Sequence, residues 1–203
     1  SESTDVAGSD GYYGTVSFTA TWTQNTYTIE YVLSGGTSGG SQPTTATYDV
    51  AFNVTNPTKA GFAFSGWSIK GMSDNCTHYY GDQTTTATEL VGVRATTFKN
   101  LRSTAGTVTF TAVWNAETYS IQYNLNQGTS PNKPEFGLNH PDTALVGEGF
   151  TVNAPTMEGY NFVGWDITGM DGVTHYYGTS ASSNTTTKST SLEKVTGTWF
   201  KDL

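Results

Sequence analysis

Residues 106–114 read Gly-Thr-Val-Thr-Phe-Thr-Ala-Val-Trp. Apolar side chains occupy every second position of this stretch, so that Val108, Phe110, Ala112 and Trp114 fall on one face, and threonine occupies most of the positions between them. A period of two residues is the pattern of a half-buried β-strand, and threonine on the opposite face fits the pleated surface of a sheet. The stretch therefore predicts a strand that contributes one face to a hydrophobic core.

The same stretch occurs a second time, at residues 14–22, as Gly-Thr-Val-Ser-Phe-Thr-Ala-Thr-Trp. Its inward positions are Val16, Phe18, Ala20 and Trp22. Self-comparison finds further segments that recur in the same order: 27–31 with 119–123, 57–72 with 155–170, 77–81 with 174–178, and 98–101 with 200–203. The chain is therefore built from repeats, with insertions confined to Ser-, Thr-, Gly- and Asn-rich stretches that are typical of loops.

The order of the segments along the chain is shifted relative to the order within one repeat. Residues 25–115 form one complete repeat domain, whereas residues 116–203 form a second that stops before its own copy of the 106–114 stretch. The copy at residues 14–22 stands alone within an N-terminal segment, residues 1–24. We therefore expect a mainly β protein of two tandem small domains, with an N-terminal β-strand that belongs to a neighbouring repeat.

Alternation predicts further strands at Tyr27–Tyr31, at residues 119–125 and at residues 48–54, where Tyr48, Val50, Phe52 and Val54 share a face. No amphipathic helix longer than about two turns is expected. Residues 88–101 are the best place for a short one.

The composition narrows the functional class. Nine Lys and Arg against seventeen Asp and Glu give a formal net charge of −8, which argues against a protein that follows nucleic-acid phosphates or an anionic membrane surface. No apolar run reaches the roughly 18 residues of a membrane span. The single cysteine, Cys76, excludes an intrachain disulfide framework. A threonine-rich chain with few charges and many aromatics indicates a secreted β protein.

The repeated segments resemble the Listeria–Bacteroides repeat, the B-repeat of internalin-type bacterial surface proteins. The residues that carry the resemblance are Tyr27 to Tyr31, Gly35-Gly36, Pro57 to Trp67 and Thr111 to Trp114 in the first copy, and Tyr119 to Tyr123 and Pro155 to Trp165 in the second. The second copy departs from the pattern, because Gln127-Gly128 replaces Gly-Gly and the closing strand is missing. The resemblance implies a compact β-grasp-like fold in tandem arrays on bacterial cell surfaces and implies no enzyme activity.

The two copies share mainly turn-forming and aromatic residues, which packing requires. We expect Trp67 and Trp165 to hold the two cores beneath Phe64 and Phe162, and Trp114 to close the first core. Reactive groups do not recur as a set, so we expect no enzyme activity, catalytic residue, metal site or cofactor. His78 and His175 recur, but one histidine per repeat is too few for a zinc site, which takes three or four protein ligands.

Each Thr-His-Tyr-Tyr-Gly segment carries a tyrosine pair, Tyr79-Tyr80 and Tyr176-Tyr177. Neighbouring residues of a strand point to opposite faces, so one ring of each pair is expected outside the core, where it could contact a glycan or another subunit.

The leading hypothesis is a structural subunit of a bacterial surface or extracellular fibre. In it, the N-terminal strand completes the second domain of the adjacent subunit, head to tail. A covalent tandem-repeat stalk is the close alternative, since both place residues 14–22 in a preceding second repeat. An adhesin repeat that binds a host or cell-surface ligand, or a carbohydrate-binding accessory domain, is the other functional class left open. No nucleic-acid partner and no membrane insertion are expected.

Overall fold

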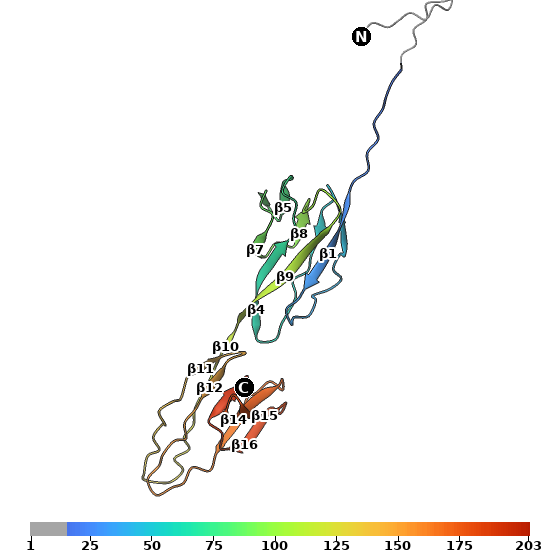
Figure 1. Cartoon of the computed structure of the whole chain (residues 1–203). Coiled ribbons are helices and arrows are strands. Elements are labelled where there is room, and N and C mark those ends of the chain that lie inside the picture. The colour runs from blue at the N-terminus through green and yellow to red at the C-terminus, as the bar shows by residue number, and fades with distance from the viewer. Residues whose placement is uncertain (1–15) are drawn as a thin grey trace, which may run out of the picture.

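The computed structural model describes residues 16–203, which form two β units placed end to end and preceded by an extended segment (Figure 1). We call residues 26–116 unit 1, residues 118–203 unit 2, and residues 16–24 the N-terminal segment. Only Glu117 separates the last strand of unit 1 from the first strand of unit 2. The described residues contain strands, turns and loops but no helix, and so none that could span a membrane.

Unit 1 consists of two sheets. The first is five-stranded, in the order β2-β1-β9-β4-β7, and the second is four-stranded, in the order β3-β8-β5-β6. The strands are β1 (Thr26–Val32), β2 (Thr45–Thr47), β3 (Phe52–Asn53), β4 (Phe62–Lys70), β5 (His78–Tyr80), β6 (Gln83–Thr85), β7 (Leu90–Val93), β8 (Thr97–Lys99) and β9 (Thr107–Ala116).

Strand β9 is the centre of the first sheet. It pairs in parallel with β1 and antiparallel with β4, so it holds the two halves of the sheet together. The first and last strands of the unit thus pair in parallel, and the layer across the core is a second sheet. The expected strand at residues 106–114 is therefore present, and its alternation positions Val108, Phe110 and Ala112 in the core.

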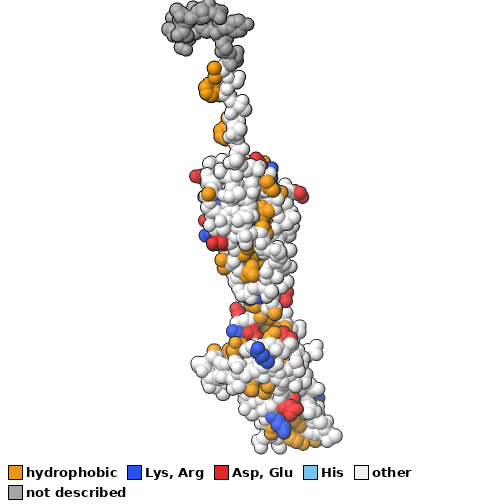
Figure 2. Space-filling model, turned by 90° about the vertical axis from the view of Figure 1, so that its right-hand side faces the viewer, with side chains coloured by type: hydrophobic (Ala, Val, Ile, Leu, Met, Phe, Trp, Pro, Cys, Tyr) orange, Lys and Arg blue, Asp and Glu red, His pale blue; other side chains and the backbone are white. Residues whose placement is uncertain are grey.

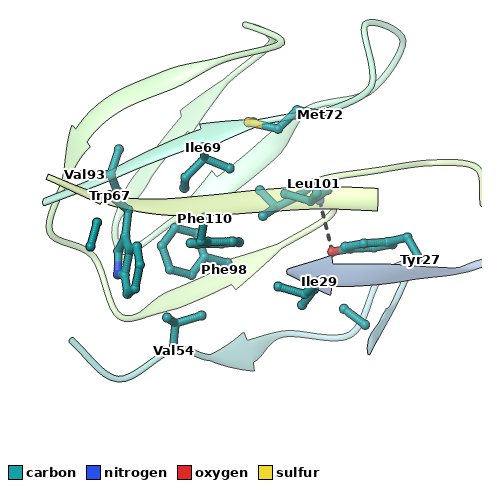
Figure 3. Close-up of a cluster of buried hydrophobic side chains, with 13 residues drawn as sticks. Tyr27, Ile29, Val54, Trp67, Ile69, Met72, Val93, Phe98, Leu101 and Phe110 are labelled. Atoms are coloured by element: carbon teal, nitrogen blue, oxygen red, sulfur yellow. Dashed lines mark hydrogen bonds between the residues drawn. The ribbon is translucent and has the colours of Figure 1, made fainter. Parts of the chain in front are cut away.

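The core of unit 1 lies between its two sheets (Figure 3). Trp67 is fully buried and meets Phe110 edge to face, with ring centroids 5.7 Å apart. Phe110 in turn meets Phe98 of the second sheet at 5.0 Å. The Tyr27 hydroxyl accepts a hydrogen bond from the Leu101 N–H, which ties the start of β1 to the chain after β8. These contacts make β9 a central element of the core as well as of the sheet.

Unit 2 repeats this plan without a central strand. Its strands are β10 (Thr118–Ser120), β11 (Thr143–Leu145), β12 (Gly149–Thr151), β13 (Trp165–Thr168), β14 (His175–Ser180), β15 (Ser183–Thr187), β16 (Ser191–Val195) and β17 (Trp199–Lys201). The sheet β12-β17-β14-β15 matches the second sheet of unit 1. The first sheet is split into two pairs, β10-β11 and β13-β16.

Three local predictions were wrong. The strand expected at residues 119–125 is limited to β10, Thr118–Ser120. The alternation over residues 48–54 does not form one strand, because Asp49 adopts a left-handed conformation with φ of 61° and turns the chain from β2 into β3 of the other sheet. Residues 88–101 form β7 and β8 in place of a short helix. Val93 there pairs with Trp67 and Phe98 with Phe52, so tertiary pairing decides the local structure.

Candidate strand-binding groove

The strands on either side of the split in unit 2 are shorter than their counterparts in unit 1. Strand β1 runs over seven residues, whereas the corresponding β10 has three. Strand β4 runs over nine residues, whereas β13 has four. Residues 121–124 and 160–164 lie outside the strands of unit 2. Their counterparts in unit 1 are the parts of β1 and β4 that pair with β9. A strand needs a partner for its main-chain groups, so both sides of the split are strands only where another neighbour supplies one.

A groove with a volume of about 370 Å³ occupies this split. It is lined from one side by residues 119–124, from the other by residues 165–170, and at its floor by Phe150, Val152, Phe200 and Leu203. The corresponding positions of unit 1 are closed, since Ile29 and Ile69 are at most 2% exposed there, whereas Ile121 and Ile167 are only half-buried. The groove is therefore the volume that β9 fills in unit 1.

The aromatic frame of the groove is already in place. Phe162 meets Trp165 with ring centroids 5.2 Å apart, as Phe64 meets Trp67 at 5.3 Å. Trp67 is fully buried, however, whereas Trp165 is half-buried and lines the groove. Both tryptophans thus lie beside the predicted phenylalanines, and only the first is covered.

Tyr123 supports the wall of the groove in the manner of Tyr31. The Tyr123 hydroxyl donates to the Pro141 carbonyl oxygen at 3.0 Å, and that of Tyr31 donates to the Pro43 oxygen at the same distance. Burial raises the pKa of Tyr123 to about 12 and holds that of Tyr31 well above its ordinary value. The hydrogen bond holds the phenol in the same place in both units, so this part of the groove wall is formed in the free chain.

Gly71 and Gly169 lie at corresponding positions where the backbone of a neighbouring strand would pass closely. Gly71 has a φ of 81°, and a Cβ added to it would collide with the carbonyl oxygen of Thr107, the first residue of β9. Gly169 holds the same conformation in unit 2, with a φ of 86°, and a Cβ added there would meet nothing within 4 Å. The second unit therefore keeps the geometry of a strand contact at a place where the described chain has no strand.

The N-terminal segment belongs to no strand, and every residue of it is exposed. Phe18 is 96% and Trp22 is 90% exposed, and Val16 and Ala20 are exposed with them. Figure 2 shows these hydrophobic side chains on the thin stalk that leaves unit 1. Residues 1–15, and so the first two residues of the repeated stretch, lie outside the described residues.

The two tyrosines of each pair lie on opposite sides of their strand. Tyr80 and Tyr177 pack against the two cores. Tyr79 lies outside, with the Lys99 Nζ over its ring at 5.2 Å from the centroid, and Lys201 covers Tyr176 in the same way at 5.4 Å. A lysine over the face of each outer ring takes up the surface on which a sugar would stack.

The recurring histidines serve the fold. Both are fully buried. The ring nitrogens of His78 lie 2.5 Å from the Asn100 carbonyl oxygen and 2.8 Å from that of Ser73, and His175 contacts the carbonyl oxygen of Asp202. In residues 16–203, no three His, Cys, Asp or Glu side chains cluster in a way that would hold a metal ion. The histidines therefore link the main chain around β5 and β14.

Sequence comparison assigns the family. Residues 27–95 and 119–193 each match the Listeria-Bacteroides repeat domain, and the two matches cover more than half of the chain. The chain belongs to this family, which occurs in bacterial surface proteins. No curated protein and no solved structure matches the chain.

Sequence reasoning pointed to the strand and to residues 119–123 as an edge without a partner, but it missed the opposite wall and the floor of the groove. Ile121, Tyr123, Ile167 and Phe200 line the groove, and of these Ile167 and Phe200 were not connected with the inserted strand. The signal was present in the repeat, because these residues correspond to Ile29, Tyr31, Ile69 and Phe98, which pack in the core that contains β9.

Proposed function

We propose that the chain is a structural subunit of a bacterial surface fibre. Residues 14–22 of one subunit insert between residues 119–124 and β13 of the next, as the central strand of its unit 2. One observation carries the proposal: the first sheet of unit 2 has the strand order of unit 1 with its centre open, and the exposed N-terminal segment has the sequence of that centre. Addition of a strand from another chain is a known mode of recognition.

Unit 1 supplies the register. Phe110 lies opposite Tyr31 on one side and Ile69 on the other, and transfer of this pairing places Phe18 between Tyr123 and Ile167. Ala112 lies opposite Trp67, which places Ala20 against Trp165. Phe18 then reaches Phe200, as Phe110 reaches Phe98. Each inward side chain of the segment thus has an apolar acceptor.

The N-terminal segment cannot fill the groove of its own chain. In the register above, Trp22 lies opposite Phe162, at the end of unit 2 that is far from unit 1. Trp22 is joined to Thr26, at the start of β1, by three residues that span roughly 14 Å at most. The ten residues of β9 alone measure about 33 Å, and both units separate the two points. Residues 14–22 therefore suit the groove of another unit 2, which we place in a second copy of the chain.

The arrangement is heterologous. The groove lies in unit 2 and the donor segment leaves the opposite end of unit 1 (Figure 1), so each added subunit presents a new groove. Contacts of this kind build open filaments in place of closed dimers. We accordingly propose an extracellular, scaffolding role without catalysis. The adhesin alternative has less support, because Lys99 and Lys201 cover the outer tyrosine rings.

A variant that lacks residues 1–22 tests the proposal. Its core should be intact, because residues 16–22 are exposed and belong to no strand. We expect it to remain in short species and to cap growing fibres of the intact chain, as measured by electron microscopy and light scattering. A Phe18→Asp variant is the matched control, since it keeps the segment but places a charge in the apolar groove. Long fibres from the truncated variant would refute strand donation.

The mass of the chains released from dissolved fibres distinguishes strand donation from a covalent tandem-repeat stalk. Native fibres dissolved in denaturant should release a single subunit mass if strands join the copies. Chains that carry many repeats through continuous peptide bonds would instead show that the groove is filled in cis and that the fibre is a tandem-repeat stalk.

A further inference from the structure

The joint between unit 1 and unit 2 is built around Glu117. Its N–H donates to the Gly61 carbonyl oxygen of unit 1 at 2.9 Å, and its carbonyl oxygen accepts from the Val146 N–H of unit 2, also at 2.9 Å. One residue is thus hydrogen-bonded to both units. The joint is a defined contact and not a free linker.

Side chains complete this joint. Gly61 has a φ of 72°, and a Cβ added to it would lie 2.6 Å from Val146 Cγ1. The Phe62 ring reaches the other unit as well, since its Cζ lies 3.6 Å from a Cβ built on Gly147. The glycine and the phenylalanine of unit 1 therefore receive the turn after β11.

The joint has a receiving half, Gly61 and Phe62, and an inserting half, the turn after β11. Counterparts of both halves occur at the outer ends of the two units. At the far end of unit 2, Gly159 repeats the conformation of Gly61 with a φ of 78°, and a Cβ added there would meet nothing within 4 Å. Tyr160, which corresponds to Phe62, is 60% exposed. Its N–H donates to the Met157 carbonyl oxygen at 3.1 Å, as the Phe62 N–H does to that of Lys59. The receiving half of a joint is therefore formed.

The inserting half lies at the start of unit 1. Asn25 stands in the place of Glu117, and its carbonyl oxygen accepts from the Tyr48 N–H at 2.9 Å, as that of Glu117 accepts from Val146. Asp49 takes the place of Gly147, because both main-chain N–H groups donate to the side chain that follows β8 or β17, Asn100 or Asp202.

We propose that these ends form a second subunit contact: Gly159 and Tyr160 of one subunit receive Tyr48 and Asp49 of the next. Tyr48 lies over Gly159 as Val146 lies over Gly61, and the Asn25 N–H donates to the Gly159 carbonyl oxygen. The inference rests on the proposed strand donation, which brings the two ends together with Trp22 and Asn25 in continuous chain. Its consequence is a fibre in which joints within and between subunits have one geometry.

Cysteine pairs test the contact directly. Tyr48→Cys combined with Gly159→Cys, in a Cys76→Val background that copies Val173, should form disulfides between subunits in oxidised fibres and give a ladder on a non-reducing gel. Gly61→Cys with Val146→Cys is the matched control within one chain. A Cβ on Gly61 lies 3.2 Å from the Val146 Cβ, a few tenths of an ångström short of the separation that a disulfide takes, so with a small local shift this pair should give a cross-linked monomer without a ladder.

A second variant separates this inference from strand donation. Tyr160→Ala should bind a synthetic peptide of residues 14–22 as the intact chain does, because that peptide ends before the joint. Its critical concentration for assembly should rise about tenfold, through loss of an interface aromatic. Fibres without a ladder, or an unchanged critical concentration, would overturn the second contact while leaving strand donation intact. Failure of the peptide to bind the intact chain would overturn strand donation itself.

Discussion

The indole Nε1 of Trp114 donates a hydrogen bond to the main-chain oxygen of Leu33, 3.0 Å away. This bond ties the end of β9 to the chain that follows β1, so the last inward residue of the central strand is fixed by the strand beside it. Trp22 and Leu125 occupy the corresponding positions in the N-terminal segment and in unit 2. The proposed fibre forms the same bond between two subunits.

The two tryptophans should therefore behave differently on truncation. Trp114→Ala removes a half-buried ring from a complete core and should lower the free energy of unfolding of unit 1 by about 3 kcal/mol. Trp22→Ala should change subunit stability by less than about 0.5 kcal/mol, because the ring is exposed. It should raise the critical concentration for assembly about thirtyfold or more. Chemical denaturation and light scattering measure the two effects. Equal losses of subunit stability in both variants would contradict this division.

The paired core tryptophans give a second test. Trp67→Ala should cost about 3–5 kcal/mol and unfold unit 1, because the side chain is fully buried. Trp165→Ala should cost less in the free subunit, since the groove leaves its ring half-exposed. The difference should shrink once the groove is filled by a peptide of residues 14–22, as followed by thermal unfolding. An unaltered melting curve for Trp67→Ala would refute its place in the core.

Hydrogen exchange tests the groove without any substitution. Main-chain amides of residues 122–124 and 161–164 should exchange quickly in the free subunit, because those residues belong to no strand there. They should become protected in the fibre. Residues 29–32 and 62–66 are the internal control, and their amides should be slow in both states because β1 and β4 already pair with β9. Absence of new protection on assembly would show that the groove stays open.

Alkaline pH should weaken the subunit. Burial raises the pKa of Tyr27 from 10.0 to about 12, so the folded state favours the neutral phenol. This contribution to stability is complete below pH 10 and is lost as the pH rises through about 12. Denaturation measured between these values should show the decline, and Tyr27→Phe should flatten it. A stability that rises over the same interval would contradict the assignment.

Tyr123 gives the corresponding readout of assembly. Its pKa is about 12 in the open groove, and the inserted Phe18 should cover the ring further and raise that pKa. Spectrophotometric titration with and without the peptide of residues 14–22 measures the change. Tyr123→Phe identifies the signal, and a pKa that falls on peptide binding would argue against insertion beside this ring.

His78 should matter for folding alone. His78→Ala removes the ring N–H that lies among the buried carbonyl oxygens of Ser73 and Asn100 and should cost about 1–3 kcal/mol. A chelator should leave the melting temperature of the intact protein unchanged. Stoichiometric metal after dialysis, or a melting temperature that drops with the chelator, would refute this expectation.

The sequence predicts well wherever a strand has its partners within the same unit. Residues 107–116 and 26–32 alternate, pair with each other and form strands as expected. Residues 48–54 alternate equally well, but Asp49 turns the chain between two sheets, and a period of two residues cannot reveal which sheet receives each half. The groove could not be read from local pattern at all, because it is defined by β10 and β13, which are distant in sequence. Only correspondence with unit 1 identifies its walls.

The parallel pairing of β1 with β9 has a mechanical consequence. The chain enters unit 1 at the beginning of β1 and leaves it at the end of β9, so tension along the long axis pulls these neighbouring strands in opposite directions. The ladder between them is loaded in shear, in which all its hydrogen bonds resist together, and not peeled open one bond at a time. A donated strand in unit 2 would carry the load in the same way, and a fibre of such units would resist pulling at every joint.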